Sequence, residues 1–71
     1  MRNMKIYYDS KYDVMYIEFS DKKVADTVEV EEGILIDYGR DKEIIGIEVI
    51  DASHRLKAMP LKEITVKFES P

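Results

Sequence analysis

The stretch VADTVEVEEGILIDYGRDKEIIGIEVI, residues 24–50, decides the fold. It contains three short segments, 24–30, 34–38 and 44–50, in which valine and isoleucine alternate with polar residues, as is typical of strands. Gly33 predicts a tight hairpin loop after two glutamates, because glycine adopts positive φ without strain. Pairing Val30 with Ile34, Val28 with Ile36 and then Tyr38 with Ile45 gives one continuous apolar face.

Two more strands are expected before this stretch, over residues 4–8 and 14–19. Pairing Tyr8 with Val14 would join them around the turn 9–13. Asp9 is expected to accept hydrogen bonds from backbone N–H groups of that turn. Because every connection before residue 51 is short, the sequence predicts a curved antiparallel β-meander of about five strands.

A short helix is expected near residues 51–58, capped by Asp51 or Ser53 and ended by Pro60. The sheet face opposite the apolar one mixes apolar and charged residues. We expect the helix to cover part of this mixed face through an apolar stripe formed by Ala52, Leu56 and Met59. A final strand is expected near residues 64–68, paired with the edge of the sheet or with another subunit. The expected class is therefore α+β, in a single domain over residues 1–71.

Size and composition favour self-association. A chain of 71 residues buries only about 60% of its surface on folding, which leaves a monomer marginally stable. It contains no cysteine, so no disulfide can compensate. A homo-oligomer, most simply a dimer, is expected. The formal net charge of −4 argues against direct nucleic-acid binding, and no apolar run is long enough to span a membrane. The N-terminus has no signal-peptide core, so a cytoplasmic location is expected.

Four segments taken in order resemble the DUF2283 family, a small domain of unknown function. They are MKIYYD at 4–9, DVMYI at 13–17, GILIDY at 33–38 and IGIEVIDAS at 45–53. Family members typically carry a glycine in the turn before the fifth strand, where this chain has residues 40–43, RDKE. The resemblance implies no catalytic residue and no cofactor. Some members are thought to act as antitoxins beside small toxin-like proteins, which implies a binding role.

Asp37 and Glu48 are the main candidates for a ligand or metal site, because the predicted register places both carboxylates on one sheet face. Paired carboxylates can bind a metal ion or perform acid–base chemistry. They can equally be solvated charges on the surface. His54 is the only histidine, and its neighbour Ser53 points in a different direction on a helix, so no catalytic pair is expected.

Two groups of residues are candidate interfaces. One is an acidic patch beside the predicted hairpin, formed by Glu29, Glu31 and Glu32, which could steer a basic partner. The other is the apolar row of the last predicted strand, formed by Ile64, Val66 and Phe68. The sequence thus favours a non-enzymatic, self-associating protein-interaction module with an antitoxin-like role. The alternative is a small enzyme or a metal- or ligand-binding protein that uses Asp37 and Glu48.

Overall fold

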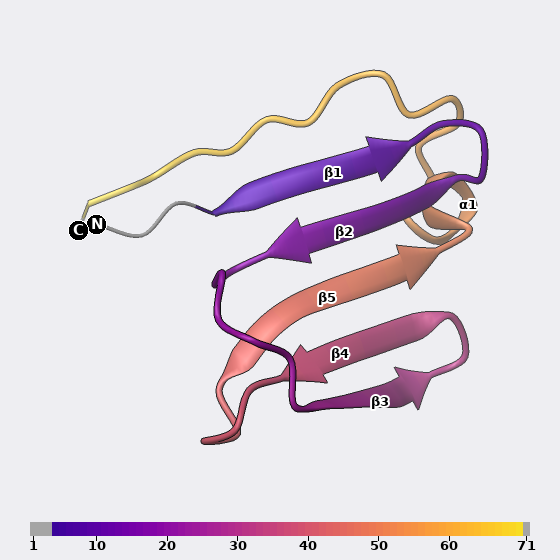
Figure 1. Cartoon of the computed structure of the whole chain (residues 1–71). Coiled ribbons are helices and arrows are strands. Elements are labelled where there is room, and N and C mark those ends of the chain that lie inside the picture. The colour runs from indigo at the N-terminus through magenta and orange to yellow at the C-terminus, as the bar shows by residue number, and fades with distance from the viewer. Residues whose placement is uncertain (1–3, 71) are drawn as a thin grey trace.

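The computed structural model describes residues 4–70 and contains one antiparallel sheet followed by a short helix (Figure 1). The elements are β1 (Lys5–Asp9), β2 (Val14–Glu18), β3 (Asp26–Glu31), β4 (Ile34–Tyr38), β5 (Ile44–Ile50) and α1 (Ala52–Arg55). The five-stranded antiparallel sheet and the helix confirm the α+β class. The expected curvature stays a prediction.

The strand order is β1-β2-β5-β4-β3, so the predicted meander is wrong. β5 lies at the centre and pairs with both β2 and β4, while residues 19–25 carry the chain past it to the far edge (Figure 1). The N–H groups of Phe19 and Ser20 both donate to the carbonyl of Ile45, at 2.8 and 3.2 Å. The physical reason is burial: the apolar side chain of Ile47 lies between Ile17 and Ile36, whereas an edge position would expose it.

Most of the expected register is present. Val28 pairs with Ile36, and Asp37 pairs with Gly46. Irregularities shift two expected pairs, so that Ile34 faces Glu31 and Tyr38 faces Ile44. The first hairpin is offset by one residue from the prediction. Tyr8 pairs with Met15 and Asp9 with Val14, because the connecting turn spans four residues.

One side of the sheet, the apolar face, gathers the hydrophobic positions of all five strands. Its members are Ile6, Tyr8, Met15, Ile17, Val28, Ile34, Ile36, Ile47 and Val49. Among the described residues, the only buried hydrophobic side chains are Met15, Ile45 and Ala52. No large side chain in residues 4–70 is below 2% exposed. The sheet is therefore a single layer without a closed core.

The helix is shorter than predicted and lies at the end of the sheet, not over its mixed face (Figure 1). It ends at Arg55 with Leu56 as the C-cap, and Lys57, three residues before Pro60, adopts φ 53. The N–H of Lys57 donates to the carbonyl of His54, and the N–H of Ala58 donates to that of Ser53. This pair of bonds is a Schellman motif, which terminates a helix without proline. Of the expected stripe, Ala52 is buried, but Leu56 and Met59 are exposed.

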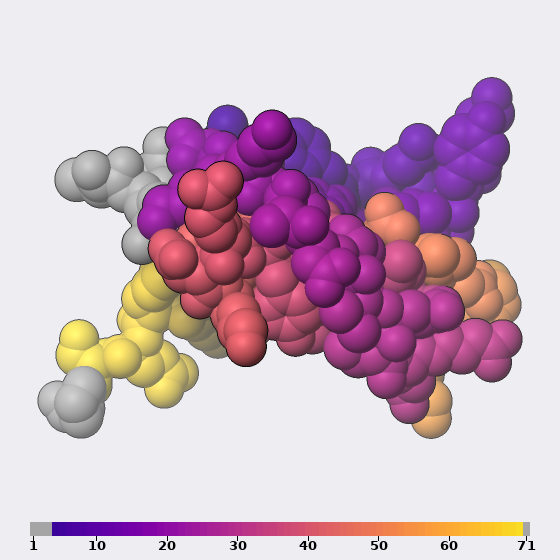
Figure 2. Space-filling view, turned by 60° about the horizontal axis from the view of Figure 1, so that its bottom comes forward, coloured from indigo at the N-terminus to yellow at the C-terminus, as the bar shows by residue number. Residues whose placement is uncertain are grey.

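The expected strand at 64–68 is not present: residues 61–70 have no regular secondary structure. The C-terminal segment, defined as residues 61–70, runs back along the sheet to the end where β1 begins, and it projects from the body in Figure 2. Ile64, Val66 and Phe68 are 44%, 58% and 93% exposed. Alternation predicts which side chains share a face, but a strand also needs a hydrogen-bonded neighbour, which this chain does not supply to the segment.

The turn between β4 and β5 leads to a stability prediction. Lys42 adopts φ 66, so it occupies the left-handed position that a glycine would suit. We expect Lys42→Gly to stabilise the protein by about 0.5–1 kcal/mol, because removing a cost of about 1–2 kcal/mol outweighs the extra backbone entropy of glycine. Denaturant unfolding at fixed protein concentration measures this. Arg40→Gly is the control and should destabilise; a loss of stability in Lys42→Gly would contradict the argument.

Candidate functional site

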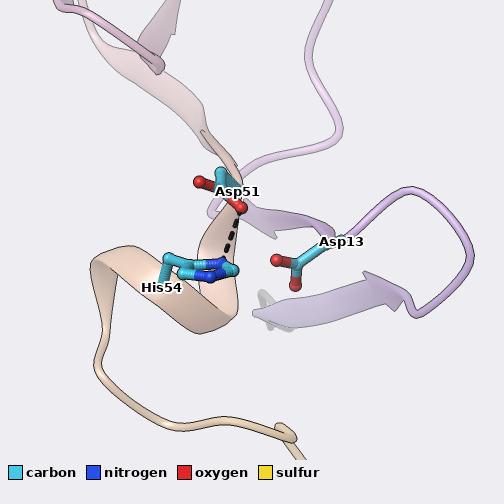
Figure 3. A group of neighbouring side chains, drawn as sticks. All are labelled: Asp13, Asp51 and His54. Atoms are coloured by element: carbon cyan, nitrogen blue, oxygen red, sulfur yellow. Dashed lines mark hydrogen bonds and ion pairs between the residues drawn. The ribbon is translucent and has the colours of Figure 1, made fainter.

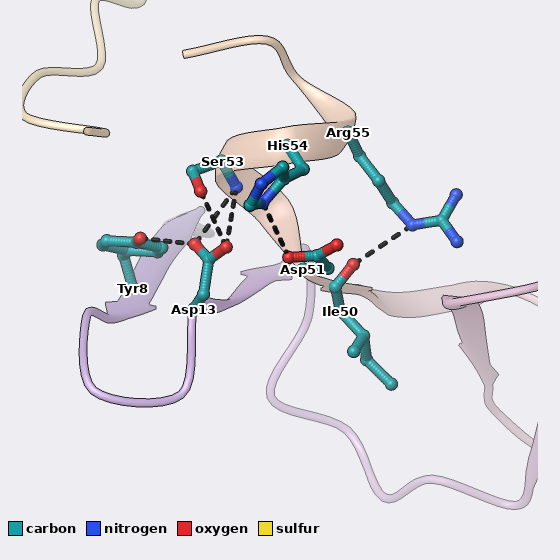
Figure 4. A network of polar contacts seen from close by, with 7 residues as sticks. All are labelled: Tyr8, Asp13, Ile50, Asp51, Ser53, His54 and Arg55. Carbon is teal, nitrogen blue, oxygen red and sulfur yellow. Dashed lines mark hydrogen bonds and ion pairs between the residues drawn. The ribbon is translucent and has the colours of Figure 1, made fainter. Parts of the chain in front are cut away.

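Asp13 joins the β1–β2 turn to α1. Its Oδ1 accepts a hydrogen bond from the Tyr8 hydroxyl at 2.5 Å, and its Oδ2 accepts one from the Ser53 hydroxyl at 2.7 Å (Figure 4). The Ser53 N–H lies 3.1 and 3.2 Å from the two oxygens. The Asp13 carbonyl also accepts the N–H of Ala52 at 2.9 Å. Asp13 therefore satisfies N-terminal N–H groups of the helix from the neighbouring β1–β2 turn.

This arrangement corrects the predicted cap. Asp51 stands at the N-cap position but adopts φ 59 and makes no side-chain capping bond, and the Ser53 side chain points to Asp13 instead. The Tyr8 hydroxyl, followed by Ser53, holds the pKa of Asp13 below its usual value, because these donors favour the charged carboxylate. The same bond raises the pKa of Tyr8. We call Tyr8, Asp13 and Ser53 the clamp.

One group of potential metal ligands lies at the start of α1 and shares Asp13 with the clamp. Within residues 4–70, ligand atoms of Asp13, Asp51 and His54 lie within 4.8 Å of one another (Figure 3). His54 Nδ1 is 3.0 Å from Asp51 Oδ1. Carboxylates and imidazole can bind divalent ions such as zinc. However, both Asp13 oxygens already accept hydrogen bonds from Ser53 or Tyr8, so an ion would have to displace these donors.

An open pocket of about 430 Å³ adjoins the clamp. Its lining combines polar groups of the clamp with the chain after the helix: Tyr8, Ser10, Asp13, Ser53, His54, Met59, Pro60 and Leu61. Tyr8, Asp13 and Ser53 in this lining are hydrogen-bonded to one another, and His54 is paired with Asp51 outside it. The geometry is therefore that of a structural junction between the sheet and the C-terminal part of the chain.

On the opposite, polar face, Asp37 is held by two hydroxyl groups. The Tyr16 hydroxyl donates to Oδ2 at 2.8 Å, and the Thr27 hydroxyl donates to Oδ1 at 2.6 Å. Gly46 makes this possible, because a Cβ there would overlap the Tyr16 ring, which lies against its backbone. Glycine in a strand interior often marks such a close approach, and the approaching group here is the Tyr16 ring. Glu48 lies on the same face, opposite Tyr16 across one strand pair and Leu35 across the other.

The two predicted candidates thus differ in their surroundings. Asp37 and Glu48 share a sheet face, as the register predicted, but neither belongs to a three-ligand metal group among the described residues. Both oxygens of Asp37 serve the cross-strand network with Tyr16 and Thr27. A role for the pair in ligand binding stays a prediction.

Burial, followed by the hydrogen bond to Asp37, raises the pKa of Tyr16 from 10.0 to about 12. The raised pKa means that the neutral phenol stabilises the fold fully below pH 10, and that this contribution is lost as the pH rises through about 12. In a spectrophotometric titration, Tyr16→Phe should remove the component with the highest midpoint. Tyr7→Phe is the control and should leave that component in place. Loss of a lower component in Tyr16→Phe would contradict the assignment.

The candidate interface residues all lie at the surface. Glu29, Glu31 and Glu32 are exposed at the β3–β4 hairpin, where Glu29 Oε2 accepts the Gly33 N–H at 3.3 Å. Gly33 has the expected positive φ, 81. The expected turn role of Asp9 is also confirmed, since its Oδ1 accepts the N–H groups of Lys11 and Tyr12.

The sequence reasoning missed the clamp. Asp13 and Ser53 are separated by 40 positions, so no local spacing connects them. The available signal was that two of the quoted motifs, at 13–17 and 45–53, begin and end with these two polar residues. A polar residue at each of two motif boundaries can indicate a long-range contact.

The fold and the clamp define a small α+β domain built on one open antiparallel sheet. The chain belongs to the family described as "Protein of unknown function (DUF2283)", whose model matches residues 5–53. These residues contain every strand, α1 to its second residue, and the whole clamp.

A relative from Methanosarcina mazei, named "Putative hypoxanthine phosphoribosyltransferase", is 38% identical over 48 residues. The match covers 68% of this chain and 38% of that protein, so the chain spans well under half of the relative. No solved structure matches the chain. No helix within residues 4–70 has the length and apolar character needed to cross a bilayer.

Proposed function

We propose that the chain is a non-enzymatic protein-interaction module that self-associates as a homodimer. The observation that carries this proposal is its surface area of 6068 Å². A compact monomer of 8.3 kDa exposes about 4,600 Å². The excess is roughly 1,500 Å², within the range of about 1,000–2,500 Å² that each subunit of an obligate dimer buries.

The apolar face and the C-terminal segment both expose hydrophobic side chains that a second copy could cover. Ile6 and Val28 on the face are 38% and 41% exposed, although they continue the same hydrophobic rows as the central strands. Monomers rarely expose contiguous apolar patches of more than a few hundred Å². Covering the face with a second copy would complete the core that the single layer lacks.

Two neighbouring positions on β1 test the proposal. Ile6 lies on the apolar face and Tyr7 on the polar face. If folding is coupled to association through the apolar face, the unfolding midpoint of the wild type rises with protein concentration. Ile6→Lys should lower the midpoint and weaken its dependence on protein concentration. Tyr7→Lys should retain the wild-type concentration dependence. A midpoint independent of concentration in the wild type contradicts the proposal.

Binding of a protein partner is the second part of the proposed role. Glu31 and Glu32 are exposed at the hairpin beside Glu29, and no ion pair among the described residues involves them. Such a patch would attract a basic protein, as expected for an antitoxin-like module with a toxin-like partner. Co-purification from the native host should recover a basic protein with the wild type, and Glu31→Lys with Glu32→Lys should release it. Equal recovery with that charge-reversed variant contradicts this role.

The phosphoribosyltransferase activity in the relative's name is not proposed for this chain. Transfer of a phosphoribosyl group requires a site for a pyrophosphate, which is commonly cradled by a glycine-rich loop. The three glycines of this chain, at positions 33, 39 and 46, are isolated from one another. A cytoplasmic location likewise stays a prediction of the sequence.

A further inference from the structure

We propose that the C-terminal segment of one copy adds as an antiparallel strand to the outer edge of β3 in a second copy. This inference rests on the proposed self-association and adds a second contact to the covered apolar face. It assigns residues 61–70 as a strand that forms only when a second chain provides the neighbour. The exchanged strand also explains why the alternation at 64–68 has no counterpart within one chain.

The outer edge of β3 is open to such an addition. β3 stands at the end of the sheet and is hydrogen-bonded only to β4. All six of its residues are exposed. Every second residue of an edge strand directs its N–H and C=O groups outward, and these groups template a further strand. β3 therefore offers backbone hydrogen bonds that a second chain can complete.

The C-terminal segment has the pattern of the missing strand. Ile64, Val66 and Phe68 alternate with Thr65 and Lys67, so a strand would place the three apolar side chains on one face. On β3, this row would extend the apolar face beyond Val28. Phe68 is 93% exposed in the single chain, which is unusual for an aromatic side chain.

Charge selects β3 over the other edge of the sheet. β3 carries Asp26, Glu29 and Glu31 and no cation, whereas β1 carries one cation, Lys5, and one anion, Asp9. Lys67 of the segment complements β3 and is like-charged with Lys5. The hydrogen bond from Gly33 engages Oε2 of Glu29, and within residues 4–70 no hydrogen bond reaches Oε1. An antiparallel register that places Lys67 opposite Glu29 would pair a cation with this oxygen.

The same register places Phe68 opposite Val28, both on the apolar face. Geometry then requires two chains. α1 and the start of the segment lie beside the β1–β2 turn, and β3 is the opposite edge of the five-stranded sheet (Figure 1). A segment that passes its own β1 can reach β3 only on another molecule. A two-fold dimer would contain the exchange twice.

Cysteine pairing tests the contact in the full-length chain. The sequence has no cysteine, so Val28→Cys and Phe68→Cys chains each carry one thiol and can join only between molecules. Mixed and oxidised under mild conditions, the two variants should give a disulfide-linked heterodimer. The control mixture pairs Val28→Cys with Lys67→Cys. Position 67 lies on the other face of the exchanged strand, so this mixture should give much less disulfide-linked heterodimer. Equal yields from the two mixtures would overturn the proposal.

Charge exchange and truncation provide the second readout. Lys67→Glu should weaken the dimer on the order of tenfold, because a cross-strand attraction becomes a repulsion in both contacts, and Glu29→Lys in the same chain should restore it. A chain ending at Pro60 should dimerise at least tenfold more weakly, because it keeps the apolar face but loses both exchanged strands. If the truncated chain remains a dimer with unchanged affinity, the exchanged strand is wrong while self-association stands. If the full chain is itself monomeric, the proposed function fails first.

Discussion

Asp13→Asn should lower the thermal midpoint by on the order of 10 °C. Asparagine tolerates the left-handed backbone at this position, where φ is 55, so the variant isolates the loss of the carboxylate from backbone strain. It replaces one acceptor oxygen with an amide that faces the Ser53 or Tyr8 donors. The junction between the helix and the β1–β2 turn is then weakened, because one side-chain acceptor is lost while the backbone bond from Ala52 remains. Calorimetry or circular dichroism at fixed protein concentration measures the shift.

The pH dependence of stability separates the charge of Asp13 from its shape. Because the folded-state pKa of Asp13 is lowered, its contribution is present above the usual value of 3.8 and is lost as the pH falls through the lower folded value. The difference between wild type and Asp13→Asn should therefore shrink in acid. Asp9→Asn is the control, since Asp9 bonds only its own exposed turn. An equal loss from both variants would show that the clamp has no special role.

Gly46→Ala should destabilise the protein by about 2–3 kcal/mol. An added Cβ would overlap the Tyr16 ring and would lie 2.9 Å from the backbone oxygen of Ile17. The ring would have to leave the sheet face, which breaks the hydrogen bond from Tyr16 to Asp37. Denaturant unfolding measures the loss, and the alkaline midpoint of Tyr16 should fall in the same variant.

A double-mutant cycle identifies the obstacle. In a Tyr16→Ala background the cost of Gly46→Ala should decrease, while the close contact with the backbone oxygen of Ile17 remains. Gly39→Ala is the matched control, because the three atoms nearest to a Cβ there all belong to the flexible carboxylate of Glu43. If Gly39→Ala costs as much as Gly46→Ala, crowding by the Tyr16 ring is not the cause.

Local pattern was sufficient for the strands and for part of their pairing. Alternation located β4 and β5, and Gly33 located the hairpin before β4 with the positive φ that it requires. The order of the strands could not be read in the same way. Short connections predict neighbours along the chain, whereas the central place of β5 sets Ile47 between Ile17 and Ile36 and leaves it half-buried.

The candidate site was likewise predictable only in part from local sequence patterns. The shared face of Asp37 and Glu48 follows from period-two geometry, and the register confirms it. The clamp required a contact between residues 13 and 53 that no spacing rule connects. The strand at 64–68 was predicted from side-chain alternation alone, and alternation says nothing about where the hydrogen-bonding partner lies.

Sedimentation equilibrium of the full-length protein at low micromolar concentration tests the central claim most directly. A single open sheet with its apolar face covered by a second copy should sediment with about twice the chain mass of 8.3 kDa and dissociate on dilution. A stable, folded species at the mass of one chain across the whole concentration range would contradict the account.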